Sequence, residues 1–487
     1  MSSSSPPGVD TLIAQAGGVA LGLHPSRDGA NHGDATGSVI PPIFPSTTYA
    51  RRVDDGAYDL RTLPGVARDV RAWNPDPDAA AAAGVRASPS PSPSRPPSTP
   101  PDGDGGGPRP RPHALMYSRP DNPTYVQAES VLAALDGGVG AALFSSGMAA
   151  AAALATALLR VGDRVAFPLR SYFAIRAFFR EHCDRSGVEF ALYDCVVPGD
   201  LARAAGDDGK CALIWVETPA NPTWEVTDLR DAAAVAESQN ASLCVDATVL
   251  TPLCFRPIDF GADFVMHSAT KYLNGHSDVV AGAVVAAADD ERWDAVRRAR
   301  AMSGAVLGPF EAWLLCRGMR TLAVRVPRQC RTAETLARRF EKRKDIVREV
   351  LYPGLASHPG HAVARAQAAS RRKRTDEGAN AALSANPRSG SGSVSDDSAS
   401  APMFGGMLSI RCAGGKEAAL RALGLVRVWC PATSLGGVES LAEHRWTLEG
   451  EGSPTPDDLL RLSVGLEDPD DLFEDLAAAL EGASRFG

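Results

Sequence analysis

The sequence contains no apolar segment long enough to cross a membrane. Its longest mostly apolar run, residues 148–159, is short and rich in alanine, whereas a membrane-spanning helix needs about 20 apolar residues. The first ten residues have neither the positive charge nor the apolar core of a secretory signal. We therefore predict no membrane contact and a cytoplasmic location, or a plastid location if a transit segment precedes this sequence.

An excess of positive charge is also missing. Lys and Arg number 50 against 58 Asp and Glu, which gives a net charge of −8. Basic residues dominate no globular stretch, and this argues against nucleic acid as a partner. The nine cysteines are scattered and none shows CxxC spacing, so reduced thiols are expected rather than a disulfide or zinc framework. We predict no bound metal.

Two stretches are poor in the apolar residues that a folded core needs. Residues 75–112 are rich in proline, glycine, serine and alanine, and residues 371–401 combine a basic run with a Gly/Ser repeat. Such compositions bury too little apolar surface to become ordered, and both are predicted to be surface-loop insertions. We expect an N-terminal arm over residues 1–114 with the first insertion, a large domain over 115–303, and a C-terminal domain over 304–487 with the second.

The large domain shows an alternation of strand-like and helix-like segments. Short apolar segments fall at residues 141–144, 164–167, 212–216, 242–246 and 262–266. Helical patterns follow the first, second and third of them. This order predicts an α/β fold with a mostly parallel sheet and helices on both faces.

The C-terminal part has a different pattern. Two helices are expected over residues 310–325 and 329–341, followed by strands and a terminal helix. The terminal helix has an apolar face formed by Leu472, Phe473, Leu476 and Leu480. We predict a smaller α+β domain here.

Lys271 stands in the most informative segment, MHSATKYLN, at residues 266–274. It follows Ser268 and Thr270 directly and lies between two segments with the composition of buried strands. A buried or charge-coupled lysine can form a Schiff base with an aldehyde cofactor, and the two hydroxyl groups could reach a phosphate on it. An isolated lysine on a turn is more often solvated, but the buried flanks favour the functional interpretation.

Polar residues follow several of the predicted strands, at the edge where ligands bind in sheets of this type. Gly147 and Met148 belong to an SSGM turn that opens a helix, so its N–H groups are a candidate phosphate cradle; the same sequence also suits a simple turn. Asp246 closes a strand. Its carboxylate would pair with a protonated pyridine nitrogen, or would cap the next helix.

An aromatic and a basic residue complete the set. Tyr172 follows a strand end and could stack on a flat cofactor or be an ordinary half-buried tyrosine. Arg461 lies in a strand-like segment; pointing inward, its guanidinium suits a substrate carboxylate, and pointing outward it would be solvated. This combination predicts pyridoxal 5′-phosphate (PLP) chemistry: it contains a lysine, donors for a phosphate, a carboxylate, an aromatic ring and an arginine.

These motifs resemble those of the Cys/Met-metabolism family of PLP-dependent enzymes, the cystathionine γ-synthase-like group of fold type I. The matching motifs, in chain order, are YSRPDNPT (117–124), SSGM (145–148), ETPANP (217–222), VD (245–246), HSATK (267–271), RGM (317–319), YPGL (352–355), SLGGVES (434–440) and RLS (461–463). The resemblance covers roughly residues 10–50, 115–370 and 402–487, and leaves out both insertions.

The resemblance implies how the cofactor is held. Lys271 would carry the Schiff base. The phosphate would be bound by Gly147, Met148, Ser268 and Thr270. Tyr117 and Arg119 would complete the phosphate site of a neighbouring subunit, so the active sites would be shared within a homodimer or homotetramer.

The resemblance also implies contacts to the ring and to the substrate. Tyr172 would stack on the ring, Asp246 would pair with its nitrogen, and Asn221 would contact its hydroxyl. Arg461, helped by Ser434, would bind the α-carboxylate of an amino-acid substrate.

Three places depart from the family pattern. Thr433 stands where the γ-synthases and γ-lyases commonly carry glutamate and bacterial β-lyases carry tyrosine. Residues 448–450 read LEG where many members read MTH, and Phe173 follows Tyr172 where glycine is frequent. The departures spare the cofactor motifs and bear on the substrate.

The expected activity is a γ-replacement on an activated homoserine by cysteine, as in cystathionine γ-synthase. The alternatives are a cystathionine γ- or β-lyase and a methionine γ-lyase. A rival from another class is a PLP-binding protein without turnover.

Overall fold

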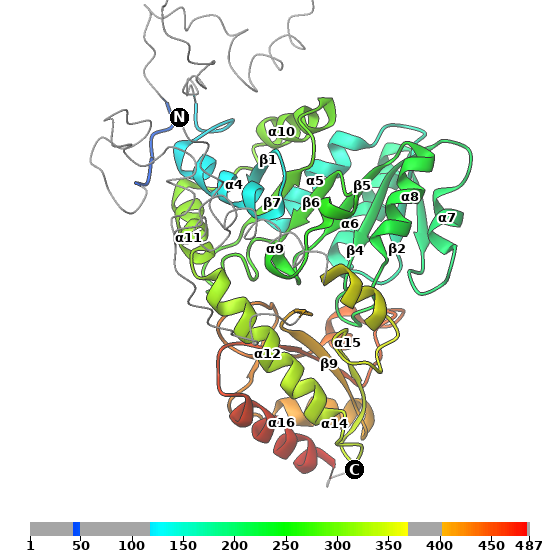
Figure 1. The fold of residues 1–487 in the computed structure, drawn as a ribbon, viewed down its shortest axis with the longest axis vertical. Coiled ribbons are helices and arrows are strands. Elements are labelled where there is room, and N and C mark those ends of the chain that lie inside the picture. Colours follow the sequence, from blue (N-terminus) through cyan, green and yellow to red (C-terminus); the bar gives the residue numbers. More distant parts are fainter. Residues whose placement is uncertain (1–41, 49–116, 369–401, 485–487) are drawn as a thin grey trace, which may run out of the picture. The chain divides into compact units, whose positions relative to one another are not determined.

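The computed structural model describes residues 42–48, 117–368 and 402–484 (Figure 1). Both predicted insertions, at 75–112 and 371–401, lie outside the described residues. The chain divides into two units, one of Met1–Pro45 with Pro123–Gly487 and the other of Ser46–Asn122. The fold and the candidate site below belong to the first unit.

The first unit contains a seven-stranded sheet. Its strands are β1 (Gly140–Phe144), β2 (Arg164–Pro168), β3 (Glu189–Tyr193), β4 (Cys211–Glu217), β5 (Ser242–Asp246), β6 (Phe264–His267) and β7 (Gly282–Ala286). They are arranged in the order β1-β7-β6-β5-β4-β2-β3. Strand β7 is antiparallel to β1 and to β6, and the other neighbouring pairs are parallel. The mostly parallel α/β sheet predicted from the sequence is confirmed.

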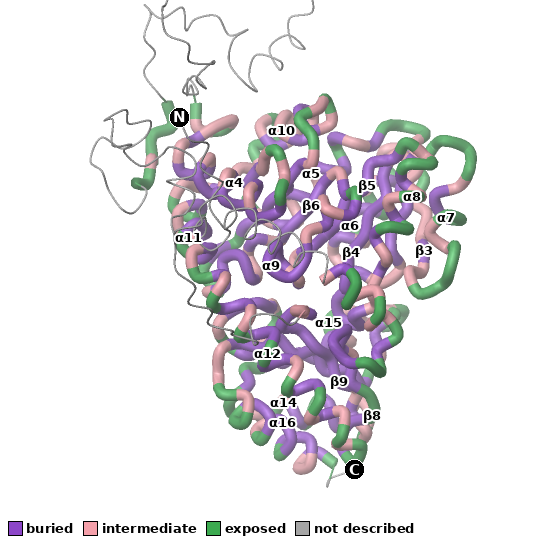
Figure 2. Tube along the Cα trace, viewed as in Figure 1, coloured by how far each residue is buried: buried purple, intermediate pink, exposed green. Residues whose placement is uncertain are grey.

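Helices cover both faces of this sheet because both faces are apolar. In β4, Leu213 and Trp215 join one buried cluster, while Ile214 and Val216 join another; this is the alternation that a strand with two buried faces requires. One cluster includes residues of α5 (Gly147–Leu158), α6 (Phe173–Ser186) and α10 (Glu291–Ser303). The other includes residues of α4 (Pro123–Asp136), α7 (Asp200–Ala205), α8 (Leu229–Gln239) and α11 (Pro309–Met319). Figure 2 shows the central strands β5 and β6 as buried.

A second sheet of five strands lies in the C-terminal part. Its strands are β8 (Val347–Leu351), β9 (Met407–Cys412), β10 (Cys430–Pro431), β11 (Leu441–His444) and β12 (Leu459–Ser463), in the order β10-β11-β12-β9-β8. Helices α14 (Gly415–Leu423) and α16 (Pro469–Ser484) contribute to its core. The predicted apolar face of the terminal helix is confirmed, since Leu472, Phe473, Leu476 and Leu480 are all buried.

Helix α12 (Leu322–Phe340) connects the two cores. Leu322 and Val326 pack in the core of the large sheet, whereas Leu336 and Phe340 pack in that of the small sheet. The helix predicted over residues 310–325 is wrong as a single element, because α11 ends at Met319 and α12 begins at Leu322. The Thr321 hydroxyl donates to the Gly318 carbonyl at 3.1 Å, and such local bonds compete with the helical ladder.

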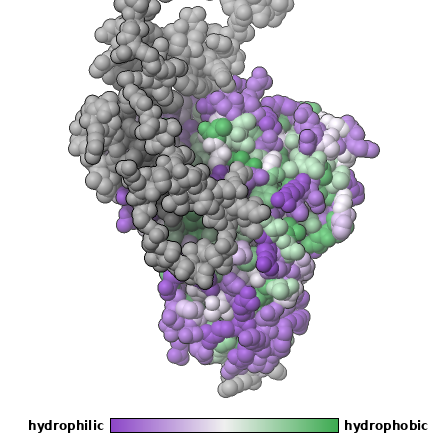
Figure 3. Space-filling view, in the orientation of Figure 1, coloured by the Kyte–Doolittle hydropathy of each residue, from purple (hydrophilic) through white to green (hydrophobic). Residues whose placement is uncertain are grey.

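The surface is mixed in character. In Figure 3, hydrophilic side chains cover most of the part that holds the small sheet, and hydrophobic ones gather in patches over the part that holds the large sheet. No described helix is long and apolar enough to span a membrane. The exposed apolar side chains include Val280, Phe310 and Val324, which are 63%, 55% and 75% exposed.

Candidate active site

Lys271 lies in a turn between β6 and β7, where the chain leaves the sheet. Its amide donates to the Ser268 carbonyl, and its carbonyl accepts from Gly275, so the turn is held at both ends. The Nζ atom donates to Ser434 Oγ at 2.8 Å. Burial, reinforced by the positive charge of Arg461, lowers the pKa of Lys271 to about 8. The amine therefore loses its proton far more easily than that of a solvated lysine, whose pKa is about 10.4.

Arg461 points inward from β12 and is 3% exposed. The outward-facing alternative is therefore wrong. Its Nη2 donates to the Ser434 carbonyl at 2.6 Å and its Nη1 to Asn221 Oδ1 at 3.3 Å. Within the described residues its Nε atom has no hydrogen-bond partner, although buried donors are normally satisfied. Ser434 thus joins the lysine and the arginine, and the buried Nε atom of Arg461 keeps a hydrogen-bonding capacity that no described residue uses.

Glu217 is a site residue to which the sequence analysis assigned no role. It ends β4, and its carboxylate accepts from the backbone N–H groups of Tyr172 at 2.7 Å and Asn221 at 2.8 Å. It also lies directly beside Asp246 in the parallel pairing of β4 with β5. Burial and the nearby Asp246 carboxylate raise the pKa of Glu217. The available signal was its place at a strand end within the ETPANP motif.

Asp246 ends β5 and is almost fully buried. Burial raises its pKa, and hydrogen bonds from Thr248 oppose that shift. The Thr248 amide and hydroxyl donate to Asp246 Oδ1 at 3.0 and 2.5 Å, and the same hydroxyl accepts from the Ser268 amide at 2.8 Å. Thr248, another residue that sequence reasoning missed, therefore fastens the carboxylate to the lysine turn.

The N-terminus of α5 lies against Ser268. A Cβ at Gly147 would come within 2.9 Å of the Ser268 Cβ, so glycine is needed for this approach. Ser146 caps the helix through the Ala149 amide at 3.0 Å, and the first N–H groups of a helix have no intrahelical acceptor and favour an anion. Met148 is half-buried in the same turn.

Thr270 is placed differently from Ser268. Its hydroxyl donates to the Ala281 carbonyl at 3.1 Å and accepts from the Ala281 amide at 2.9 Å. In this structure the hydroxyl fastens the lysine turn to the segment before β7. A bond from it to a phosphate would replace the bond to the Ala281 carbonyl.

These residues fit the cofactor predicted from the sequence. The turn at Gly147 offers N–H groups for a phosphate, Asp246 offers a buried carboxylate for a ring nitrogen, and Lys271 offers an amine of lowered pKa. Tyr172 precedes α6 with a half-buried ring, which packs edge-on against Phe173 with the centroids 5.2 Å apart.

Tyr117 and Arg119 lie in the second unit. There the Arg119 guanidinium carbon is 5.9 Å from the centre of the Tyr117 ring. Thr48 pairs with Tyr117 in an isolated antiparallel bridge, and Ser118 Oγ donates to the Ser46 carbonyl. Their part in the phosphate site of a neighbouring subunit stays a prediction.

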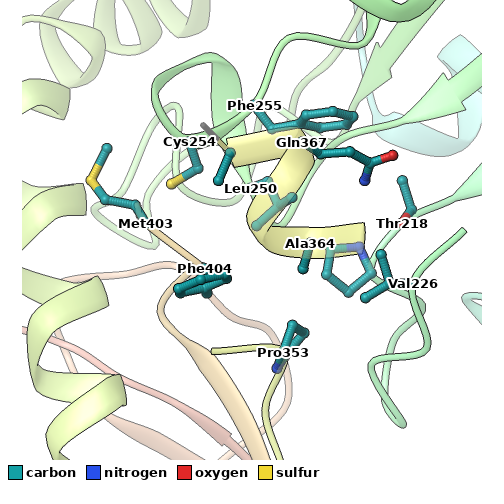
Figure 4. Close-up of a pocket in the computed structure, with 12 residues that line it drawn as sticks. Thr218, Val226, Leu250, Cys254, Phe255, Pro353, Ala364, Gln367, Met403 and Phe404 are labelled. Atoms are coloured by element: carbon teal, nitrogen blue, oxygen red, sulfur yellow. The ribbon is translucent and has the colours of Figure 1, made fainter. Parts of the chain in front are cut away.

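A separate pocket lies where Leu250, Cys254 and Phe255 face Met403 and Phe404 (Figure 4). Every side chain that lines it is uncharged, and none belongs to the predicted site. An uncharged, mostly apolar lining offers a phosphate or a carboxylate no stabilising charge. The chemistry is therefore assigned to the Lys271 site.

Comparison with known proteins agrees with this geometry. The profile of the family described as Cys/Met metabolism PLP-dependent enzyme matches residues 104–373 and 397–481. The chain belongs to this family. It is therefore a PLP-dependent enzyme of sulfur amino-acid metabolism, and the family relationship implies pyridoxal phosphate as its cofactor.

The relatives include both synthases and lyases. A cystathionine γ-synthase of Mycobacterium bovis is 38% identical over 370 residues, which cover 75% of this chain and 86% of the relative. A cystathionine γ-lyase of Saccharomyces cerevisiae is 35% identical over 381 residues, covering 76% of this chain and 88% of the relative. Among solved structures, a cystathionine γ-synthase of Xanthomonas oryzae pv. oryzae in complex with aminoacrylate and cysteine matches with a TM-score of 0.73 and 29% identity, covering 99% of this chain and all of that one.

Proposed function

We propose that this enzyme replaces the γ-substituent of an activated homoserine by cysteine and so forms cystathionine. The observation that carries the proposal is the contact of Lys271 Nζ with Ser434, whose carbonyl in turn accepts from Arg461. An amine of lowered pKa beside a guanidinium supports this proposal, because an amino-acid substrate needs a proton acceptor for its α-carbon and a cation for its carboxylate. The γ-synthase relatives support replacement over elimination.

The cofactor contributes an electron sink, which stabilises negative charge at the α- and β-carbons of the bound amino acid. Lys271 Nζ would hold the cofactor aldehyde in the absence of substrate and would accept the α-proton in its presence. Asp246 would keep a proton on the ring nitrogen, because a carboxylate this buried is stabilised by a cation. The first N–H groups of α5 and Ser268 would hold the phosphate.

The remaining site residues would orient the substrate. Arg461 would bind the α-carboxylate, with the Ser434 carbonyl and Asn221 fixing the guanidinium plane. Glu217 would accept from the backbone N–H groups of both Tyr172 and Asn221 and so keep these two residues at a fixed distance from each other. Tyr172 would cover the ring face and Asn221 its hydroxyl.

We further propose a homodimer or homotetramer in the cytoplasm, in which Tyr117 and Arg119 complete the neighbouring subunit's phosphate site. Exposed apolar side chains such as Phe310 and Val324 are suited to contact another subunit. The domain boundary near residue 303 stays a prediction, since α12 takes part in both cores.

A substrate panel tests the activity. The protein loaded with PLP is given activated homoserine esters with and without cysteine, then cystathionine or methionine alone. We expect cystathionine to form only when both an ester and cysteine are present. Ammonia and a 2-oxo acid from cystathionine or methionine alone would instead establish a lyase, the second candidate, which the yeast relative favours.

A further inference from the structure

A second buried arginine lies beside Arg461. Arg445 begins the short helix α15 (Arg445–Glu449) and is 2% exposed. Its Nη1 lies 3.4 Å from Glu443 Oε2 and its Nη2 lies 3.1 Å from Glu449 Oε1. No sequence motif assigns a role to Arg445, and Glu449 belongs to the stretch at residues 448–450 that departs from the family pattern.

Glu443 connects the two arginines. It pairs with Arg461 across strands β11 and β12, and its Oε2 atom forms ion pairs with both Arg461 and Arg445. One carboxylate beside two cations offsets only part of their combined charge, so Arg461 keeps positive charge to offer to another anion. Glu443 is itself buried, so solvent screens these attractions little.

Arg445 is held in place on its other sides. Its guanidinium carbon lies 5.2 Å from the centre of the Phe173 ring and 5.9 Å from that of the Tyr172 ring. Glu449 is fixed by the hydroxyls of Ser453 at 2.5 Å and Thr455 at 2.8 Å. The charge of Arg445 therefore has a defined position, between the predicted ring-stacking residue and the carboxylate that pairs with Arg461.

We propose that Arg445 is a positioning residue for substrate binding, which pairs with the Glu443 carboxylate that also pairs with Arg461 and holds that carboxylate when a substrate arrives, so that Arg461 can bind the α-carboxylate. Without Arg445, Arg461 would be the only ion-pair partner that the Glu443 carboxylate has within the described part of the chain, and the carboxylate would compete with the substrate. The inference rests on the role proposed above for Arg461. It applies to a γ-synthase and a γ-lyase alike, since both bind an amino acid.

The test compares glycine with methylamine, two ligands that differ by the carboxylate. Their dissociation constants are measured on the PLP-loaded protein from the change in cofactor absorbance. Arg445→Met is expected to raise the dissociation constant of glycine about 10-fold, as loss of one favourable charge interaction would. The dissociation constant of methylamine is expected to stay unchanged. Arg445→Lys is expected to restore part of the glycine affinity.

Two double variants separate competition by Glu443 from a change in net charge. Arg445→Met with Glu443→Gln and Arg445→Met with Glu449→Gln remove the same charges. Only the variant without the Glu443 carboxylate is expected to recover glycine affinity. Equal recovery in both, or recovery in neither, would overturn the proposal.

Single variants guard against misfolding and against an error in the underlying function. Without the Glu449 carboxylate, Arg445 should pair more closely with Glu443. In Glu449→Gln, glycine should therefore bind as tightly as before or more tightly. Weaker glycine binding would contradict the proposal. Equal weakening of both ligands by Arg445→Met would show a merely structural role. If Arg461→Leu does not alter the preference for glycine over methylamine, the proposed role of Arg461 fails first.

Discussion

The two sheets contribute to the site in different ways. The large sheet supplies Asp246 and Lys271 from strand ends and turns that match the family's motifs. The small sheet supplies Arg461 and Glu443 from paired strands, with Arg445 next to them in a network of buried charges. Two of the three departures from the family, at residues 433 and 448–450, fall on the small-sheet side, and the third, Phe173, begins α6 beside the large sheet. We therefore propose that the large sheet fixes the cofactor chemistry and the small sheet adjusts substrate binding.

The largest effect is expected for Lys271→Ala. Loss of the amine would remove both the proposed attachment point of the cofactor and the proposed proton acceptor, so turnover should fall by at least about 10³-fold. Steady-state kinetics measures the loss, with Lys342→Ala, an exposed lysine, as the control. Substantial turnover without Lys271 would show that the large sheet does not supply the catalytic amine.

Arg461→Leu tests the small sheet directly. Loss of charged hydrogen bonds to a carboxylate costs about 1.5–3 kcal/mol, so KM for the amino-acid substrate should rise roughly 10- to 100-fold while cofactor binding is retained. Arg411→Leu is the matched control, because Arg411 lies on neighbouring β9 and pairs with Asp458 outside the site. A loss of cofactor binding in Arg461→Leu would show that cofactor binding and substrate binding are not separated between the two sheets.

Glu217→Gln removes one of two oxygens that accept backbone N–H groups. A glutamine leaves one N–H facing an NH₂ group, which should cost about 1–3 kcal/mol of unfolding free energy. Urea denaturation measures this change against Glu439→Gln at an exposed position. Equal stability of the two variants would show that the carboxylate does not hold Tyr172 and Asn221.

The smallest effect concerns pH. A lysine reacts with acylating reagents only when neutral, and the pKa of Lys271 is lowered to about 8 by burial and Arg461. In the cofactor-free protein, its labelling rate should therefore rise with pH to a half-maximum near pH 8, about two units below a model lysine peptide.

Ser434→Ala sharpens this pH measurement. The Ser434 hydroxyl accepts a hydrogen bond from Nζ and so favours the charged amine. Its removal should shift the labelling half-maximum to lower pH by up to about one unit, as expected for a bond worth about 0.5–1.5 kcal/mol. An upward shift would mean that Ser434 does not accept from the amine.

The sequence predicted the large-sheet side more completely than the small-sheet side. The turn carrying Lys271 and the strand ending in Asp246 are local patterns that periodicity and motif reveal. The role of Glu217 depends on backbone groups of Tyr172 and Asn221, which no pattern of side chains discloses.

The network of Glu443, Arg445 and Glu449 depends on side chains meeting across strands and a short helix. In the sequence, nothing distinguishes Arg445 from an ordinary exposed arginine. Its burial follows from the packing of the small sheet, which the sequence pattern does not indicate. The break between α11 and α12 was predicted at residues 326–328 instead of at Arg320 and Thr321, since the apolar pattern continues across these two residues.

The most direct test of the central claim is to locate the cofactor. The PLP-loaded protein is reduced with borohydride, which makes a lysine–aldehyde linkage permanent, and its peptides are analysed by mass spectrometry. We predict that the added mass lies on Lys271. Cofactor on another lysine, with Lys271 unmodified, would contradict the account.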